Sequence, residues 1–425
     1  MSRISEGDYV FMQLPSGNHK IVRVVADSLI VLGKFGSVSA NTLVNLPFYE
    51  TYDIISKTEV RKIAAEPADD LETSAESGIN DVLTMEGNKI QYHGNQTLSM
   101  SEIEQFKQSG LKGDALIKKI QEAHQDFDKK TEFSKAKYLK RKKAKYMHTF
   151  CPLPMTCDRL LDLYIDKDPA RVLGMDPATL AHMLSLANVR PGGRYLIMDE
   201  SPSVLTTAIL ERLGNKGCVV IAHENEHPNL DGLKYFPQWM PSDDFEGENP
   251  MVRLINLLDL FCPEETLPFV EKDADSLKGT QKTQYLRQLY RENQRLWVRK
   301  QCELGFDAVI VLSTLNLVDI VPRLLEFAAG STPLVVYSDA RENLVNLTLA
   351  LKKDLRVLAP TIMETRLRKF QTLPGRMHPT MTAKGYSGVL LHGIRVLPDS
   401  AAVAVGMAAQ RKKRKIEPAE NTVQT

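Results

Sequence analysis

The chain has 425 residues, of which 43% are apolar and 25% charged, and its formal net charge at pH 7 is +1. This length suits two or three domains, and no run approaches the ~20 consecutive apolar residues of a membrane helix, so we expect a soluble, intracellular protein with no membrane partner. Its five scattered cysteines exclude a disulfide framework and a paired-cysteine metal site, so we expect reduced thiols and no metal.

The first 62 residues predict a small antiparallel β-barrel domain. Short β-rich runs at residues 9–12, 21–25 and 28–32 alternate with turn signals at residues 15–18 and 33–36. Short strands joined by tight turns are typical of such barrels. So short a segment buries only a modest core, and we expect it to lean on another part of the chain.

Residues 63–98 predict an acidic linker with a short β segment, because the run is acidic and poor in aromatic residues. Residues 99–188 predict a helical and basic connector. Ser101 offers a helix N-cap, and Gly110 and Gly113 divide the first helical stretch.

Within this connector, residues 129–146 carry nine basic residues and one acidic residue. Such density of one charge repels itself unless an anion is near, which favours a polyphosphate partner. Tyr138 and Tyr146 are interleaved and could stack on splayed bases. A solvated helix face and a nuclear-import signal are the alternatives. The candidate RNA-binding residues are Lys135, Lys137, Lys140, Arg141, Lys142, Lys143 and Lys145.

Residues 189–400 predict a doubly wound, Rossmann-like α/β domain, because strand and helix patterns alternate. An acidic insertion at residues 241–280 interrupts the alternation, with a short ordered run at residues 252–261. Residues 401–425 predict a disordered basic tail. Strands are expected at residues 194–198, 217–222, 307–312 and 333–337, and helices at 204–213, 282–304, 318–327 and 344–351.

The loop after the first of these strands resembles a degenerate S-adenosylmethionine site. Active methyltransferases have a Gly-x-Gly-type loop there, which lets the backbone approach the cofactor. The chain has no glycine in its loop, and Pro202 lacks a backbone N–H. We therefore expect this chain to bind no cofactor and to have no catalytic residue, although an ordinary strand-to-helix turn would read similarly. The loop is Asp199, Glu200, Ser201, Pro202 and Ser203.

Two other strand ends bear on the same question, and one of them lacks the acid that catalysis would need. An enzyme that methylates adenine at N1 would need a carboxylate after residue 312, but the sequence continues Ser313-Thr314-Leu315-Asn316. Asp319 follows at the start of the next helix, where it suits the helix dipole. Glu224 and Glu226 could mimic a ribose-binding acid or could lie in a solvated loop.

Further basic residues lie near the C-terminus of the α/β pattern. Residues 365–381 predict a hairpin loop, because two prolines and a glycine punctuate it. His378 there is either functional or a satisfied loop residue. The candidate RNA-binding residues in this loop are Arg366, Arg368, Lys369, Arg376 and His378.

Two more basic patterns remain open. Arg287, Arg291, Arg295 and Arg299 recur every four residues and form a stripe along one predicted helix. They suit phosphates or interface carboxylates, or form a solvated face with local pairs such as Arg295 with Glu292. The basic run at residues 411–415 indicates nuclear import, with added RNA affinity as the alternative.

Four motifs, taken in order, carry a resemblance to a known family. The chain resembles the non-catalytic subunit of the eukaryotic tRNA 1-methyladenosine-58 methyltransferase over most of residues 5–400. The motifs are Gly7-Asp8-Tyr9-Val10, Gly33-Lys34-Phe35-Gly36, Lys142-Lys143-Ala144-Lys145-Tyr146 and Leu373-Pro374-Gly375-Arg376-Met377-His378-Pro379.

The resemblance implies a catalytic partner of the same fold that carries S-adenosylmethionine, in a heterotetramer of two of each subunit. It further implies a nuclear protein that holds tRNA, including initiator methionine tRNA, with Arg376 beside the partner's active site or on the RNA. Two other hypotheses compete with it. One is an active RNA methyltransferase with an unusual cofactor loop, and the other is a scaffold or translation-initiation protein.

Overall fold

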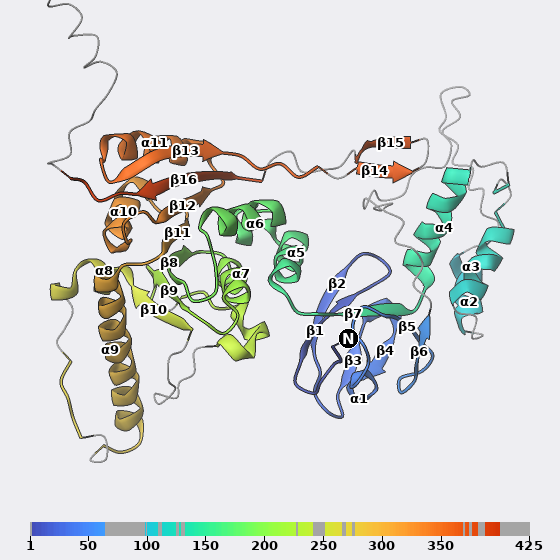
Figure 1. Cartoon of the computed structure of the whole chain (residues 1–425). Coiled ribbons are helices and arrows are strands. Elements are labelled where there is room, and N and C mark those ends of the chain that lie inside the picture. The colour runs from blue at the N-terminus through green and yellow to red at the C-terminus, as the bar shows by residue number, and fades with distance from the viewer. Residues whose placement is uncertain are drawn as a thin grey trace, which may run out of the picture.

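Two bodies make up the described chain: a β domain with a helical lobe, and a larger α/β domain (Figure 1). No described helix combines the length and apolar content that crossing a bilayer requires. The computed structural model describes residues 2–63, 98, 100–108, 113–124, 127–128, 132–226, 228–240, 251–265, 269–273, 277–368, 370–373, 376–380 and 387–399.

The β domain is antiparallel, as predicted. Its main sheet has the strand order β2-β1-β7-β5-β6, and β3 pairs with β4 beside it. Val10, Met12, Phe35 and Phe150 lie in its buried core. No pairing among the described strands joins β2 to β6, so closure into a barrel stays a prediction. The elements are β1 (Tyr9–Gln13), β2 (His19–Arg23), β3 (Leu29–Val31), β4 (Ser37–Ser39), α1 (Ala40–Leu43), β5 (Thr51–Ile54), β6 (Val60–Ile63) and β7 (Thr149–Pro154).

The central strand β7 corrects the predicted domain boundary. The sequence predicts a helical connector over residues 99–188, and the prolines at 152 and 154 argue against a strand there. The backbone N–H of Tyr49 donates to the Pro152 carbonyl at 2.9 Å, on the side of β7 away from β1. The nitrogen of Pro152 points to that same side, so its missing N–H removes no hydrogen bond to β1. The β domain therefore includes residues 149–154.

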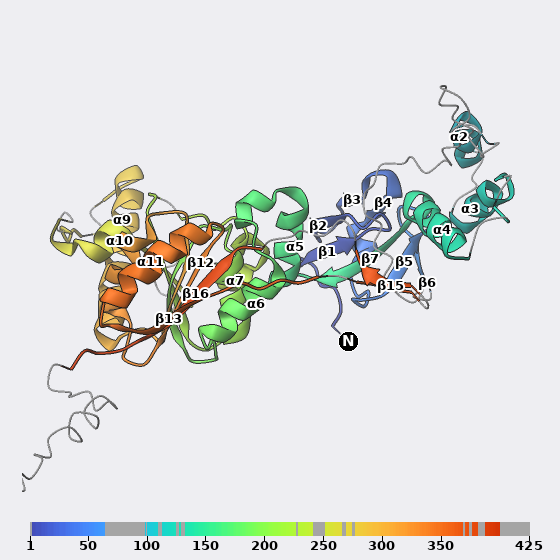
Figure 2. The same cartoon turned by 90° about the horizontal axis from the view of Figure 1, so that it is seen from above.

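Three helices form a lobe on the side of the β domain remote from the α/β domain (Figures 1 and 2). Their shared core contains Ile103, Leu116, Ile117, Ile120 and Tyr146. These helices confirm the helical part of the predicted connector. They are α2 (Met100–Gln108), α3 (Gly113–Glu122) and α4 (Glu132–Tyr146).

The α/β domain is built on a seven-stranded sheet of order β10-β9-β8-β11-β12-β16-β13. The first five strands are parallel, and β16 is antiparallel to both of its neighbours. All four predicted strands are confirmed. The strands are β8 (Arg194–Asp199), β9 (Cys218–His223), β10 (Val252–Asn256), β11 (Ala308–Leu312), β12 (Pro333–Ser338), β13 (Val357–Met363) and β16 (Val389–Arg395).

Helices cover both faces of this sheet, as a doubly wound domain requires. One apolar core joins the sheet to α5, α6 and α7, and a second joins its other face to α9, α10 and α11. The helices are α5 (Cys157–Lys167), α6 (Pro177–Leu186), α7 (Val204–Leu213), α8 (Leu257–Phe261), α9 (Thr280–Leu304), α10 (Leu317–Leu324) and α11 (Arg341–Lys353).

Strand β10 lies inside the segment that the sequence predicts as an acidic insertion. It pairs in parallel with β9 and forms one edge of the sheet, and α8 follows it directly. The ordered run predicted at residues 252–261 is therefore part of the domain itself. Strand β10 has only five residues of mixed polarity, which is too few for a periodic pattern to predict a strand. Residues 241–250 and the tail from 400 onward lie outside the described residues.

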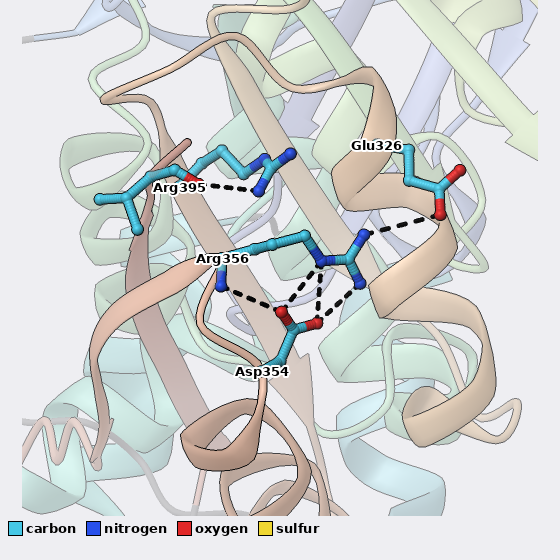
Figure 3. Close-up of polar contacts among 5 residues, drawn as sticks. Glu326, Asp354, Arg356 and Arg395 are labelled. Atoms are coloured by element: carbon cyan, nitrogen blue, oxygen red, sulfur yellow. Dashed lines mark hydrogen bonds and ion pairs between the residues drawn. The ribbon is translucent and has the colours of Figure 1, made fainter. Parts of the chain in front are cut away.

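A charge cluster lies at the amino edge of the parallel strands (Figure 3). Arg356 donates to both carboxylate oxygens of Asp354, and it lies 3.6 Å from a carboxylate oxygen of Glu326. The hydrogen bonds from Arg356 lower the pKa of the Asp354 carboxyl. Arg395 is 7% exposed and donates to the Val396 carbonyl at 2.8 Å. Burial, followed by the neighbouring Arg356, lowers the pKa of Arg395.

Candidate functional site

The carboxyl ends of β8, β9 and β11 are where open α/β sheets bind ligands. In this chain the loop after β8 turns its acid inward. One oxygen of Asp199 accepts from the backbone N–H and the hydroxyl of Ser201, and the other accepts from the N–H and hydroxyl of Thr206, at 2.9 and 2.7 Å. Burial raises the pKa of Asp199, while these hydrogen bonds oppose the rise. All four donors are thereby used within the chain.

The rest of the loop fills the space where a cofactor would approach. Ser201 and Ser203 are 0% and 1% exposed, and the Ser203 hydroxyl donates to the Asn229 carbonyl at 2.9 Å. The Ser201 hydroxyl lies 3.1 Å from the N–H of Val204 and caps the start of α7. A Cβ at Gly232 would lie 2.1 Å from the Pro202 carbonyl oxygen, so the 232 backbone packs directly on the loop.

The residues present therefore do not fit S-adenosylmethionine. A bound nucleoside cofactor needs a backbone that it can approach and free N–H groups at the helix start. Here Asp199 and Ser201 already take those N–H groups, and buried side chains occupy the loop. The sequence predicts this misfit from the missing glycines and from Pro202, but it does not reveal that Asp199 accepts hydrogen bonds within the chain.

The neighbouring strand ends show the same inward bonding. Glu200 accepts from the N–H and hydroxyl of Thr314, both at 2.8 Å, and from the hydroxyl of Ser313. Glu200 thereby joins the loop after β8 to the loop after β11. The loop after β11 is the one in which the sequence shows no carboxylate for catalysis. Asp319 lies in the first turn of α10, as predicted. Glu224 and Glu226 are exposed, and neither makes a side-chain hydrogen bond or ion pair with the described residues.

The predicted basic residues of the connector lie on α4. Lys137 and Lys145 are exposed, and the other five are half-buried. Lys142 lies 5.1 Å from the centre of the Tyr138 ring, and Lys135 lies 5.6 Å from that of Phe127. These distances are measured from the Nζ atoms, so both ammonium groups make cation–π contacts with the rings. Between positions 135 and 145, α4 places seven positive charges along roughly 15 Å of helix axis.

The two tyrosines of α4 pack against neighbouring parts of the helical lobe. The Tyr138 ring meets His124 and Phe127 edge-on, with ring centres 5.1 and 5.6 Å apart, and Tyr146 is 3% exposed. Burial raises the pKa of Tyr138 to about 12. Stacking on a splayed base is therefore wrong for the buried Tyr146 in this structure, whereas for the half-buried Tyr138 it stays a prediction.

The predicted hairpin loop is confirmed as β14 (Phe370–Leu373) paired with β15 (Arg376–Pro379). Arg366 and Arg368 are exposed in the segment that leads into it. His378 is exposed and its Nδ1 lies 2.8 Å from the Pro379 carbonyl oxygen, as for a satisfied loop residue. Arg376 begins β15, whereas Lys369 lies outside the described residues. The hairpin lies away from its parent sheet, toward α4 (Figure 1).

The arginine stripe lies on α9. Arg295 is bound by Asp259 at 3.3 Å and by Glu292, which confirms the predicted local pair. Arg287, Arg291 and Arg299 are exposed. The stripe thus divides into one structural arginine and three surface arginines. In the described part of the chain, no group of three acidic, histidine or cysteine side chains could hold a metal ion.

The sheet order, with its single antiparallel strand, and the filled loop define a class: proteins with the Rossmann-like methyltransferase fold whose cofactor position is closed. The fold is similar to that of a SAM-dependent O-methyltransferase from Thermotoga maritima, with a TM-score of 0.50 at 9% identity, covering 93% of this chain and 96% of that one. A likeness at this identity shows the fold alone.

The chain belongs to the Gcd10p family, whose model matches residues 3–284. It is 36% identical to a protein of Debaryomyces hansenii, over 97% of this chain and 90% of the relative. It is 26% identical to a protein of Mus musculus, over 80% and 78%. Both relatives are named tRNA (adenine(58)-N(1))-methyltransferase non-catalytic subunit TRM6. The family resemblance predicted from the four motifs is thereby confirmed.

Proposed function

We propose that this chain is the non-catalytic subunit of a tRNA (adenine(58)-N(1))-methyltransferase, which holds tRNA for a catalytic partner. The observation that carries the proposal is the loop after β8, where Asp199 and Ser201 bind the N–H groups of the α7 start. A family member with this loop closed needs another chain to hold S-adenosylmethionine. The names of its relatives support the same assignment.

The tRNA is held by two basic elements in this proposal. One is α4, with Lys135, Lys137, Lys140, Arg141, Lys142, Lys143 and Lys145. The other is the hairpin with the segment leading into it, which carries Arg366, Arg368, Lys369, Arg376 and His378. Phosphate contacts of this kind set affinity and orientation without reading sequence. They suit a subunit that grips tRNA while the chemistry proceeds elsewhere.

The assembly we propose is a heterotetramer of two such subunits and two catalytic partners, and its substrates include initiator methionine tRNA. The family resemblance supports both points. We propose nuclear localisation, supported by the basic run at residues 411–415. Fusing residues 405–425 to a reporter protein tests this: the fusion should accumulate in the nucleus, and replacing the five basic residues by alanine should abolish accumulation.

Calorimetry and methyl transfer test the central proposal together. The chain alone should bind no S-adenosylmethionine up to millimolar concentration, and it should methylate nothing. Co-expressed with its catalytic partner, it should co-purify at equal stoichiometry and raise that partner's tRNA methylation. Cofactor binding in the micromolar range by the isolated chain would favour an active methyltransferase instead. Co-purification without any effect on tRNA binding or methylation would favour a scaffold.

A further inference from the structure

The hairpin belongs to the part of the chain between β13 and β16, which we call the arm, and whose described residues are 366–368, 370–373 and 376–380. The two ends of this arm are bound together at its root. The Ser387 hydroxyl donates to the Thr365 carbonyl at 2.7 Å. Thr179 of α6 joins them, since its hydroxyl contacts the hydroxyl of Thr365 and lies 3.4 Å from that of Ser387.

Tyr337 at the end of β12 completes the root. Its hydroxyl donates to the Leu173 carbonyl at 2.7 Å and lies 3.3 Å from the Ser387 carbonyl oxygen. Thr179 and Tyr337 are both 0% exposed, and Ser387 is 6% exposed. Burying hydroxyl groups is unfavourable unless they are hydrogen-bonded, so such a cluster specifies one arrangement of the segments that it joins.

Gly388 allows the chain to pass close to Tyr337. Its φ of +83° is a conformation that L side chains rarely adopt, and an added Cβ would lie 2.2 Å from the Tyr337 hydroxyl oxygen. The returning chain therefore runs directly against the Tyr337 ring. Beyond the root, several side chains of the arm are exposed: Arg366 and Arg368, and also Leu367, Phe370 and Met377, at 53%, 48% and 76%.

We infer that the hydroxyl cluster of Thr179, Tyr337, Thr365 and Ser387 sets the direction of the arm, and that Thr179 and Tyr337 are positioning residues for tRNA. This inference rests on the proposed function. A segment oriented before binding loses less conformational entropy when it binds, so affinity depends on its root. Both residues are fully buried, so they would act on tRNA binding through the arm and not by contacting the RNA.

The test compares Thr179→Val and Tyr337→Phe with the conservative Thr179→Ser. The matched control is Thr348→Val, because Thr348 is also buried, at 8% exposed, and its hydroxyl donates within α11, to the Leu344 carbonyl. In the full chain, trypsin cleavage after Arg366 and Arg368 should be about ten-fold faster in the two root variants, as loss of one buried hydrogen bond predicts.

In the complex with the catalytic partner, the root variants should raise the KM for tRNA about ten-fold and leave kcat unchanged. Thr179→Ser should restore both readouts, and Thr348→Val should change neither, even if it lowers Tm. Root variants that match Thr348→Val in cleavage and in KM would overturn the inference. A wild-type complex that neither binds nor methylates tRNA would instead contradict the proposed function, which separates the two failures.

Discussion

Reversing the charge of two lysines on α4 should change how salt affects tRNA binding. Lys137 and Lys145 suit this change, since both are exposed and neither has an ion pair with a described residue. Each phosphate contact contributes about 0.9 to the slope of log affinity against log salt. The double variant Lys137→Glu/Lys145→Glu should therefore reduce the slope by about two.

The magnitude follows directly from that slope. Between about 50 and about 200 mM salt, a four-fold change, one contact accounts for about 3.5-fold in affinity and two contacts for about 12-fold. The variant should lose that much less affinity over the range than the wild type. Fluorescence anisotropy of labelled tRNA with the intact two-subunit complex measures both curves.

The control reverses the charge of two exposed lysines elsewhere in the chain. Lys216 precedes β9 and Lys353 ends α11, so both lie at the amino edge of the sheet, where we propose no RNA contact. Lys216→Glu/Lys353→Glu makes the same change in net charge. It should lower affinity slightly and leave the slope unchanged. Equal slopes for the wild type and the α4 variant would refute the assignment of α4 to phosphate binding.

Three further predictions concern stability and packing. Asp199→Asn should lower the free energy of unfolding by about 2 to 3 kcal/mol, measured by urea titration. The reason is that an amide has one acceptor oxygen for the four donors of Ser201 and Thr206. Glu226→Gln is the control and should change stability little. The lowered pKa of Asp354 stabilises the fold above its unfolded value of about 4, and this contribution is lost as the pH falls below it. Urea titrations at about pH 5 and about pH 3 should therefore differ more for the wild type than for Asp354→Asn, and equal differences would disprove the argument. Tyr138→Phe should leave tRNA affinity within about two-fold, because phenylalanine keeps the ring that packs edge-on against His124 and Phe127. Tyr138→Ala should reduce helical circular dichroism and affinity together.

The alternation of strands and helices from residue 194 onward made the α/β domain predictable. Each of β8, β9, β11 and β12 is a short apolar run, buried on both faces, which is the pattern of a central parallel strand. Strands β7 and β10 escaped prediction for different reasons. β7 contains two prolines, which argue against a strand unless the neighbouring strands need no N–H at those positions. β10 is a short edge strand beside an acidic run.

The candidate site was predictable only in part. The missing glycines after β8 indicate a lost cofactor, since glycine is a local requirement of the backbone. The partner of each side chain is not local. Glu200 finds its donors at Ser313 and Thr314, more than a hundred positions along the chain. The basic run likewise predicts a charged helix, but the inward direction of Tyr138 depends on His124 and Phe127 from outside that helix.

The position of β7 has a consequence for how the polypeptide can be divided and synthesised. β7 lies between β1 and β5 in the main sheet. A fragment that ends at residue 63 therefore contains two separate pairs of that sheet, β1 with β2 and β5 with β6, without the strand that joins them. During synthesis on the ribosome, the five-stranded sheet cannot form completely until residue 154 has been made. By then α4, which ends only three residues before β7, has also been made. The helix α4, which we expect to contact RNA, is therefore connected directly to the strand that completes the sheet.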